Sequence, residues 1–161
     1  MTTGEYNESV NLYADNIYRF ILKNIKDQDK AKDIVQDTYE KLWLRVETVS
    51  YEKARSYLFT TAYHTMIDML RRDAKQSSME SVSPSEYSHS EQYSDLHEVL
   101  NQAIQLLPEA QRSVIMLRDY EGYSYEEIAE ITGLSISQVK VYIFRGRIFL
   151  KEYIGKVETV L

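Results

Sequence analysis

Polar and basic side chains gather in one stretch near the end of the sequence, in a pattern suited to binding duplex DNA. Hydroxyl and amide groups can hydrogen-bond to base edges in the major groove, and cations bind the backbone phosphates. The residues of this stretch that offer such groups are Ser135, Ser137, Gln138, Lys140, Arg145 and Arg147. Their combination indicates recognition of DNA by both charge and base sequence.

A helix-turn-helix would place these side chains in a groove. Ser124 and Glu127 form a capping-box pattern that begins a short helix, and Gly133 supplies the turn that ends it. Ser135 begins a longer second helix that runs to about residue 153. The apolar residues expected to pack the two helices together are Ile128, Ala129, Leu134, Val139 and Ile143. The second helix of such a motif enters the major groove. An ordinary helical hairpin with a solvated basic face is the alternative.

Residue types that carry catalysis are scarce in the chain. The three histidines, His64, His89 and His97, have no third ligand at metal-binding spacing, and there are no cysteines. No glycine-rich phosphate loop is present. The sequence therefore predicts a protein without enzymatic activity, metal or cofactor.

The net charge of −6 over 161 residues conceals a segregation of charge along the chain. Residues 77–98 contain five acidic residues and no Lys or Arg, whereas residues 134–153 contain four basic residues and one acidic residue. Charge asymmetry of this kind is more informative than the total. The overall acidity therefore does not exclude a nucleic-acid partner.

The composition predicts an all-α fold in two small helical domains. With 5 Gly and 2 Pro, the chain has few helix breakers, and 43% of its residues are hydrophobic. A Ser-rich acidic stretch over residues 77–95 is expected to be a flexible linker between domains at 1–76 and 96–161. No signal peptide or stretch of about 20 apolar residues is present, so we expect a cytoplasmic protein that does not insert into membranes.

Periodicity predicts three helices in the first domain and four in the second. The first three span about residues 7–25, 31–46 and 54–76; Asp27 or Asp29 caps the second, and Trp43 is expected in its core. The third helix has an apolar arc too wide for one buried face. The last four span about residues 95–107, 108–120, 125–132 and 135–153, and the second of these has Pro108 in its first turn.

With these elements in place, the sequence resembles the bacterial sigma-70 family. LPEAQRSVIMLR at 107–118, EGYSYEEIAE at 121–130 and GLSISQVK at 133–140 resemble region four, and AKDIVQDTYEKLW at 31–43 and YLFTTAYHTMIDMLRR at 57–72 resemble region two. Two such modules joined by a short linker resemble the extracytoplasmic-function (ECF) group. The resemblance covers about residues 8–153 and implies a sigma factor that directs transcription initiation by core RNA polymerase.

The resemblance also implies roles for individual residues. Core polymerase would be bound by the polar face of the second helix, at Asp33, Gln36, Asp37, Glu40 and Lys41. The third helix would open the −10 element and hold it as a single strand, with candidate contacts at Arg55, Tyr57, Phe59, Tyr63, Arg71, Arg72 and Lys75. A solvated face and core positions for the aromatic rings are the respective alternatives.

The helix-turn-helix would bind the duplex −35 element through its second helix. The candidate residues there are Ser135, Ser137, Gln138, Lys140, Val141, Tyr142, Arg145 and Arg147. The resemblance further implies an anti-sigma partner, either membrane-bound or not, and a linker that threads through the polymerase; a plain solubilising tether is the alternative for the linker.

The sequence departs from the family pattern at positions that bear on promoter recognition. Val141, Tyr142 and Phe144 stand where a small polar residue, Arg and His are usual, and Tyr57 and His64 stand where Trp and Asn are usual. Fewer cations remain to anchor phosphates, so we expect the isolated second domain to bind DNA weakly. Known promoter sequences are not expected to transfer to this chain.

Two other classes of function are open on the sequence alone. A helix-turn-helix regulator would bind palindromic duplex DNA as a dimer, without polymerase, but it leaves the polar face of the second helix and the surplus aromatics of the third unexplained. A pure interaction protein would show no salt-dependent affinity for DNA, and the basic charge of residues 134–153 argues against it.

Overall fold

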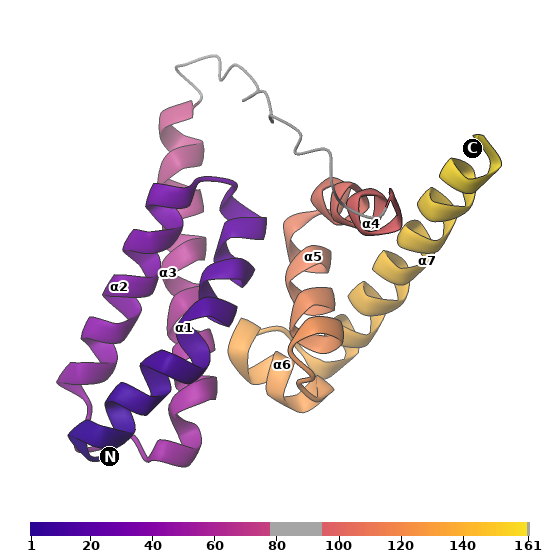
Figure 1. Ribbon diagram of the computed structural model, residues 1–161. Coiled ribbons are helices and arrows are strands. Elements are labelled where there is room, and N and C mark those ends of the chain that lie inside the picture. Colours follow the sequence, from indigo (N-terminus) through magenta and orange to yellow (C-terminus); the bar gives the residue numbers. More distant parts are fainter. Residues whose placement is uncertain (78–94, 161) are drawn as a thin grey trace.

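A computed structural model describes residues 1–77 and 95–160 (Figure 1). These residues form helices and contain no strand, which confirms the all-α prediction. The elements are α1 (Thr3–Ile25), α2 (Gln28–Leu44), η1 (Tyr51–Lys53), α3 (Ala54–Ser77), α4 (Asp95–Leu106), α5 (Glu109–Ile115), η2 (Met116–Tyr120), α6 (Tyr125–Thr132) and α7 (Ile136–Val160). The predicted linker lies outside the described residues, apart from its two ends. No described helix is both long and apolar enough to cross a membrane.

Side-chain caps set where the first two helices begin. Thr2 and Glu5 form a capping box, in which the Thr2 hydroxyl accepts from the Glu5 N–H at 3.1 Å and the Glu5 carboxylate accepts from the Thr2 N–H at 2.8 Å. Helix α1 therefore begins at Thr3, one turn before the predicted start at Asn7. Asp27 caps α2, accepting from the Lys30 N–H at 3.1 Å, which settles the alternative between Asp27 and Asp29.

Helices α1, α2 and α3 pack around a shared apolar core. Its largest fully buried side chains are Ile17, Phe20, Ile21, Ile34, Leu42, Leu58, Phe59 and Met66. The prediction that Trp43 belongs to this core is wrong, because 48% of its surface is exposed. Trp43 follows the exposed Gln36 by seven residues and Glu40 by three, so it lies at the edge of the polar face of α2. Its indole packs edge-on against Tyr6, with ring centroids 5.1 Å apart.

Helices α4 to α7 form the second bundle, and a buried arginine joins two of them. Arg112 on α5 donates to the carbonyl oxygens of Ile104, Gln105 and Leu107, at 3.2, 3.3 and 2.7 Å. It thereby satisfies carbonyls that the end of α4 leaves without helical partners. Helix α7 also approaches α5 closely at Gly146, because a Cβ there would collide with the side chain of Ile115.

The predicted helix from Pro108 to Tyr120 has a different internal structure. Helix α5 keeps α-helical geometry to Ile115 and then continues as the π-helical turn η2. The wider turn brings the chain to Gly122, where φ is +76°, and to the buried Tyr123. Glycine suits this left-handed conformation because it has no Cβ.

The two bundles pack directly on each other. Helix α6 lies against α3, and α5 lies against the end of α1 (Figure 1). Residues of both bundles join one hydrophobic cluster, in which Phe59 and Tyr123 meet with ring centroids 5.6 Å apart. The molecule is therefore closed, with the helix-turn-helix placed beside the third helix of the first bundle.

Candidate nucleic-acid interface

Helices α6 and α7 form the helix-turn-helix predicted from the sequence. The Ser124 hydroxyl accepts from the Glu127 N–H at 3.1 Å, and the Glu127 carboxylate accepts from the Ser124 N–H at 3.0 Å, which confirms the capping box. The hydrogen bond from the Ser124 backbone N–H lowers the pKa of the Glu127 carboxyl below its ordinary value. Gly133 ends α6 with φ of +78°, and its N–H donates to the Ala129 carbonyl at 2.9 Å.

A second reciprocal cap begins α7. The Gln138 side-chain oxygen accepts from the Ser135 N–H at 2.9 Å, and the Ser135 hydroxyl accepts from the Gln138 N–H at 3.1 Å. The Ser135 hydroxyl and the Gln138 side-chain oxygen, two groups predicted to contact bases, are therefore already engaged in the helix cap. The amide nitrogen of Gln138 takes no part in the cap, so it is the group that could donate to a base edge.

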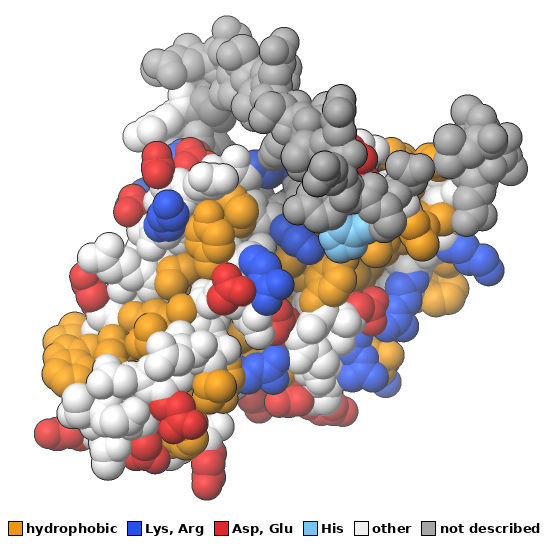
Figure 2. All heavy atoms as spheres, in the orientation of Figure 1, with side chains coloured by type: hydrophobic (Ala, Val, Ile, Leu, Met, Phe, Trp, Pro, Cys, Tyr) orange, Lys and Arg blue, Asp and Glu red, His pale blue; other side chains and the backbone are white. Residues whose placement is uncertain are grey.

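The remaining predicted −35 residues divide between the exposed and packed sides of α7. Ser137, Lys140, Val141 and Arg145 are exposed, whereas Tyr142 is half-buried against the hydrophobic cluster. Arg147 donates to the Asp119 carboxylate of η2 at 2.6 Å, so its guanidinium is engaged within the second bundle. Basic and hydrophobic side chains lie side by side along the edge of the molecule formed by α7 (Figure 2).

Four predicted −10 residues at the start of α3 lie at or near the contact between the bundles. Phe59 and Tyr63 are buried, and Tyr57 is half-buried against the cluster. Arg55 donates to the Glu121 carbonyl at 2.6 Å, pairs with the Glu121 carboxylate at 3.3 Å and lies 4.4 Å from the Tyr123 ring centroid. In this closed arrangement, the Phe59 and Tyr63 rings cannot stack on bases.

Burial dominates the electrostatics of the Arg55–Glu121 pair. It raises the pKa of the Glu121 carboxyl above its ordinary value, and the charge of Arg55 opposes this shift without cancelling it. The contacts of Arg55 with Glu121 join the two bundles, while the desolvation of Glu121 offsets part of the attraction.

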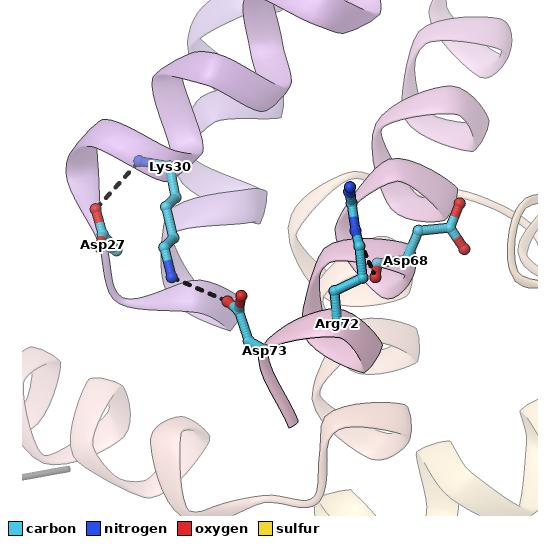
Figure 3. Close-up of polar contacts among 5 residues, drawn as sticks. All are labelled: Asp27, Lys30, Asp68, Arg72 and Asp73. Atoms are coloured by element: carbon cyan, nitrogen blue, oxygen red, sulfur yellow. Dashed lines mark hydrogen bonds and ion pairs between the residues drawn. The ribbon is translucent and has the colours of Figure 1, made fainter. Parts of the chain in front are cut away.

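The three predicted −10 residues at the far end of α3 are exposed: Arg71, Arg72 and Lys75. Figure 3 shows this end of the helix. Lys30 at the start of α2 pairs with Asp73 at 2.9 Å and fixes the two helices to each other. Arg72 turns away from that pair and donates to the Asp68 carbonyl of its own helix at 3.4 Å. Arg71 and Arg72 thus lie where a phosphate backbone could reach them.

The predicted polymerase-binding residues form one polar face along α2. Asp33, Gln36, Glu40 and Lys41 are exposed, and Asp37 is partly exposed. Asp37 pairs with Lys41 at 2.9 Å, one turn along the helix. The face ends at a shallow hollow of about 430 Å³, lined by Tyr6, Glu40, Trp43 and Leu44.

Sequence reasoning missed the apolar end of this face. Leu44 is the most exposed large hydrophobic residue of the described chain, and Trp43 lies beside it. Exposed apolar patches rimmed by polar groups are typical of protein-binding surfaces. Helical spacing from Gln36 and Glu40 was the signal that could have placed Trp43 at this edge. Among the described residues, no group of three or more His, Asp or Glu side chains is arranged to hold a metal.

The fold and these surfaces define a helical DNA-binding protein of two bundles with a helix-turn-helix in the second. Residues 10–76 match the family Sigma-70 region 2, and residues 97–150 match Sigma-70, region 4. The chain belongs to the sigma-70 family and, within it, to the ECF group. It is a promoter-recognising initiation factor and not an enzyme, which confirms the resemblance seen in the sequence.

Curated relatives of similar length support this assignment. The RNA polymerase sigma factor YlaC of Bacillus subtilis is 33% identical, over 89% of this chain and 88% of that protein. Sigma factor SigV of the same organism is 34% identical, over 83% of this chain and 81% of that protein. The sigma factor RpoE of Bartonella quintana, solved in complex with the anti-sigma factor NepR, has a TM-score of 0.80 and 26% identity, and covers 93% of this chain and 96% of that one.

Proposed function

We propose that this sigma factor divides promoter recognition between its two bundles. Residues 1–76 bind core RNA polymerase and open the −10 element, residues 96–161 bind the duplex −35 element, and residues 77–95 join them. The observation that carries this proposal is the order of the two family matches on the two helical bundles, with the outer face of α7 exposed.

The polymerase-binding surface is the polar face of α2, from Asp33 to Lys41, together with the exposed Trp43 and Leu44. A charged stripe next to an apolar hollow suits a partner that presents both charged and apolar side chains. Rim charges steer the encounter, and buried aromatic residues supply most of the affinity at protein interfaces.

Contact with the −10 strand through Phe59 and Tyr63 requires the two bundles to separate. Phe59 meets Tyr123 of the second bundle, and Arg55 is tied to Glu121. Arg71, Arg72 and Lys75 are exposed at the far end of α3 and could bind phosphates without this change. We therefore propose that the −10 strand is bound by an open form of the protein, in which the two bundles have separated.

An anti-sigma factor is the regulatory partner that we propose, in the cytoplasm where the polymerase acts. The RpoE structure that this fold matches contains such a factor, NepR. A partner that binds both bundles in the closed arrangement would keep Arg55, Phe59 and Tyr63 away from DNA. This regulation would need no change in the helix-turn-helix itself.

Run-off transcription with purified core RNA polymerase on fragments of the source genome tests the proposal. Specific transcripts should appear only when the protein is added. Asp37→Arg should reduce them about tenfold or more, because it reverses the charge of a side chain at the centre of the proposed surface. Asp15→Arg is the matched control: Asp15 also forms an exposed i,i+4 pair, with Arg19 on α1, but lies off the proposed surface.

Two results would contradict the proposal. One is the absence of any protein-dependent transcript together with failure to co-elute with core polymerase. The other is an equal loss of transcription in the Asp37→Arg and Asp15→Arg variants, which would place the effect in stability and not in binding.

A further inference from the structure

The outward face of α7 is apolar at its centre. Ser137, Lys140, Val141, Phe144 and Ile148 recur at three- and four-residue spacing, so they share one side of the helix, and all five are exposed. The opposite side carries Val139, Ile143, Gly146 and Leu150, which are buried. Phe144 is 66% exposed. Removing an exposed Phe side chain from water would stabilise the protein by about 1.5–3 kcal/mol. This exposure indicates that the ring is covered by a partner.

The surroundings of Phe144 favour DNA as that partner. Lys140 and Lys151 lie on the same side of the helix as Phe144, and Arg145 is its exposed neighbour. Three cations beside an apolar side chain suit a polyanion whose grooves contain apolar groups. The major groove offers such a group, the C5-methyl of thymine, which phenylalanine contacts in protein–DNA complexes.

We infer that Phe144, supported by Val141, reads thymine methyl groups in the duplex element bound by α7. The inference deepens the proposed −35 recognition and rests on it. Phe144 lies seven residues after Ser137, about 10 Å along the helix, and Val141 lies between them. The polar residues of the first turn would therefore meet one part of the groove, and the two apolar residues would meet the base pairs beside it.

The closed packing of the bundles leaves this face open. Helix α7 packs against α4, α5 and α6 with its opposite side, and Figure 1 shows it at the edge of the molecule away from α1 to α3. The groove-reading residues are therefore accessible even in the closed arrangement, in contrast to Phe59 and Tyr63 on α3.

The experiment uses the full chain bound to core polymerase and a promoter recovered by the run-off assay. Each thymine of the upstream element is replaced in turn by deoxyuridine, which removes only the methyl group. Wild-type protein should lose about fourfold in affinity at one or two neighbouring positions, the factor expected for one buried methyl-sized group. Phe144→Ala should bind the thymine and deoxyuridine duplexes equally.

Two control variants separate methyl reading from other effects. Lys140→Ala should weaken binding to both duplexes by the same factor, because a phosphate contact does not distinguish the bases. Leu106→Ala should behave as the wild type, since Leu106 is 61% exposed but lies on α4. Phe144 is exposed, so its variant is expected to fold; thermal unfolding checks this.

The inference is overturned if the wild type binds every deoxyuridine duplex as tightly as thymine, or if Phe144→Ala keeps the wild-type ratio. A Phe144→Ala variant that loses polymerase binding and not methyl discrimination would assign the ring to a protein contact and also overturn it. Failure of the proposed function is separate, because transcripts would then be missing before any duplex was modified.

Discussion

Tyr63 is one of the buried tyrosines whose burial can be followed by the ionisation of the side chain itself. Its side chain is buried near the contact between the bundles, and burial raises its pKa to about 12, with the charge of Glu109 on α5 acting in the same direction. Because this pKa is raised above the ordinary value of about 10, the group contributes stability that is complete below pH 10. That contribution is lost as the pH rises through about 12.

Alkaline titration followed by tyrosine absorbance tests this position. Tyr63→Phe should leave the absorbance change between pH 9 and 11 equal to that of the wild type, because Tyr63 does not ionise in that range. The difference should appear near pH 12, together with loss of helical circular dichroism. A smaller change in the variant below pH 11 would show that Tyr63 is exposed in solution.

At the scale of single residues, the sequence indicated which side chains could contact DNA, but not which of them are accessible. Arg71 and Arg72 were predicted to contact phosphates, and they are exposed; Phe59 and Tyr63 were predicted as stacking platforms, and they are buried. All four residues lie on α3. What covers a ring depends on a second bundle distant in sequence, which periodicity within one helix cannot report.

At the scale of the helices, the end of α4 is capped by an arginine of the next helix, α5. Arg112 on α5 donates to three carbonyl groups at the end of α4 and is buried, and its burial lowers its pKa below the ordinary value. A buried charge is tolerated only where such bonds satisfy it. Arg112 therefore supplements the apolar cluster of Ala103, Ile104, Ile115 and Leu150 in holding α4 within the second bundle.

Arg112→Met should lower the free energy of unfolding by about 3 kcal/mol, since buried carbonyls lose charged donors. Urea unfolding of the full chain measures this. Arg118→Met is the comparison: Arg118 is only partly buried and donates to the Tyr123 carbonyl at 2.9 Å, so its loss should cost about 1 kcal/mol. Equal effects of the two substitutions would contradict the capping role of Arg112.

The predicted start of a helix was correct where the sequence analysis used a capping pattern, and it was in error by about one turn where it did not. The Ser124–Glu127 box placed the start of α6 correctly, while the Thr2–Glu5 box, present in the sequence, was passed over and α1 was predicted to begin a turn late. The π-helical turn η2 has no capping pattern at its start and was not predicted.

In the whole molecule, the contact between the bundles depends on a small polar centre around Arg55. Its bonds to Glu121 and its position over the Tyr123 ring join the start of α3 to the segment before α6. A second contact, between Asn24 on α1 and Arg112, is longer, at 3.5 Å. Arg55 is therefore the residue whose loss should weaken the closed arrangement most directly.

Arg55→Ala should destabilise the contact between the bundles by about 1.5–3 kcal/mol, the range for a hydrogen bond to a charged group. The chain has no cysteine, so Glu8→Cys and Lys151→Cys can carry a fluorescent donor and acceptor for energy transfer. Arg55→Ala should lower the transfer efficiency, whereas Arg72→Ala, an exposed arginine of the same helix, should not. Unchanged transfer in both variants would contradict the role of Arg55.

The closed packing sets an energetic threshold for every ligand that needs the buried side of α3. If closed molecules outnumber open ones a hundredfold, the apparent affinity of such a ligand falls a hundredfold below its intrinsic affinity. The outer face of α7 carries no such penalty. The −10 strand would thus compete against an intramolecular equilibrium, while duplex DNA bound by α7 would not. A single substitution at Arg55 would shift the affinity for the −10 strand and leave the affinity for the duplex unchanged.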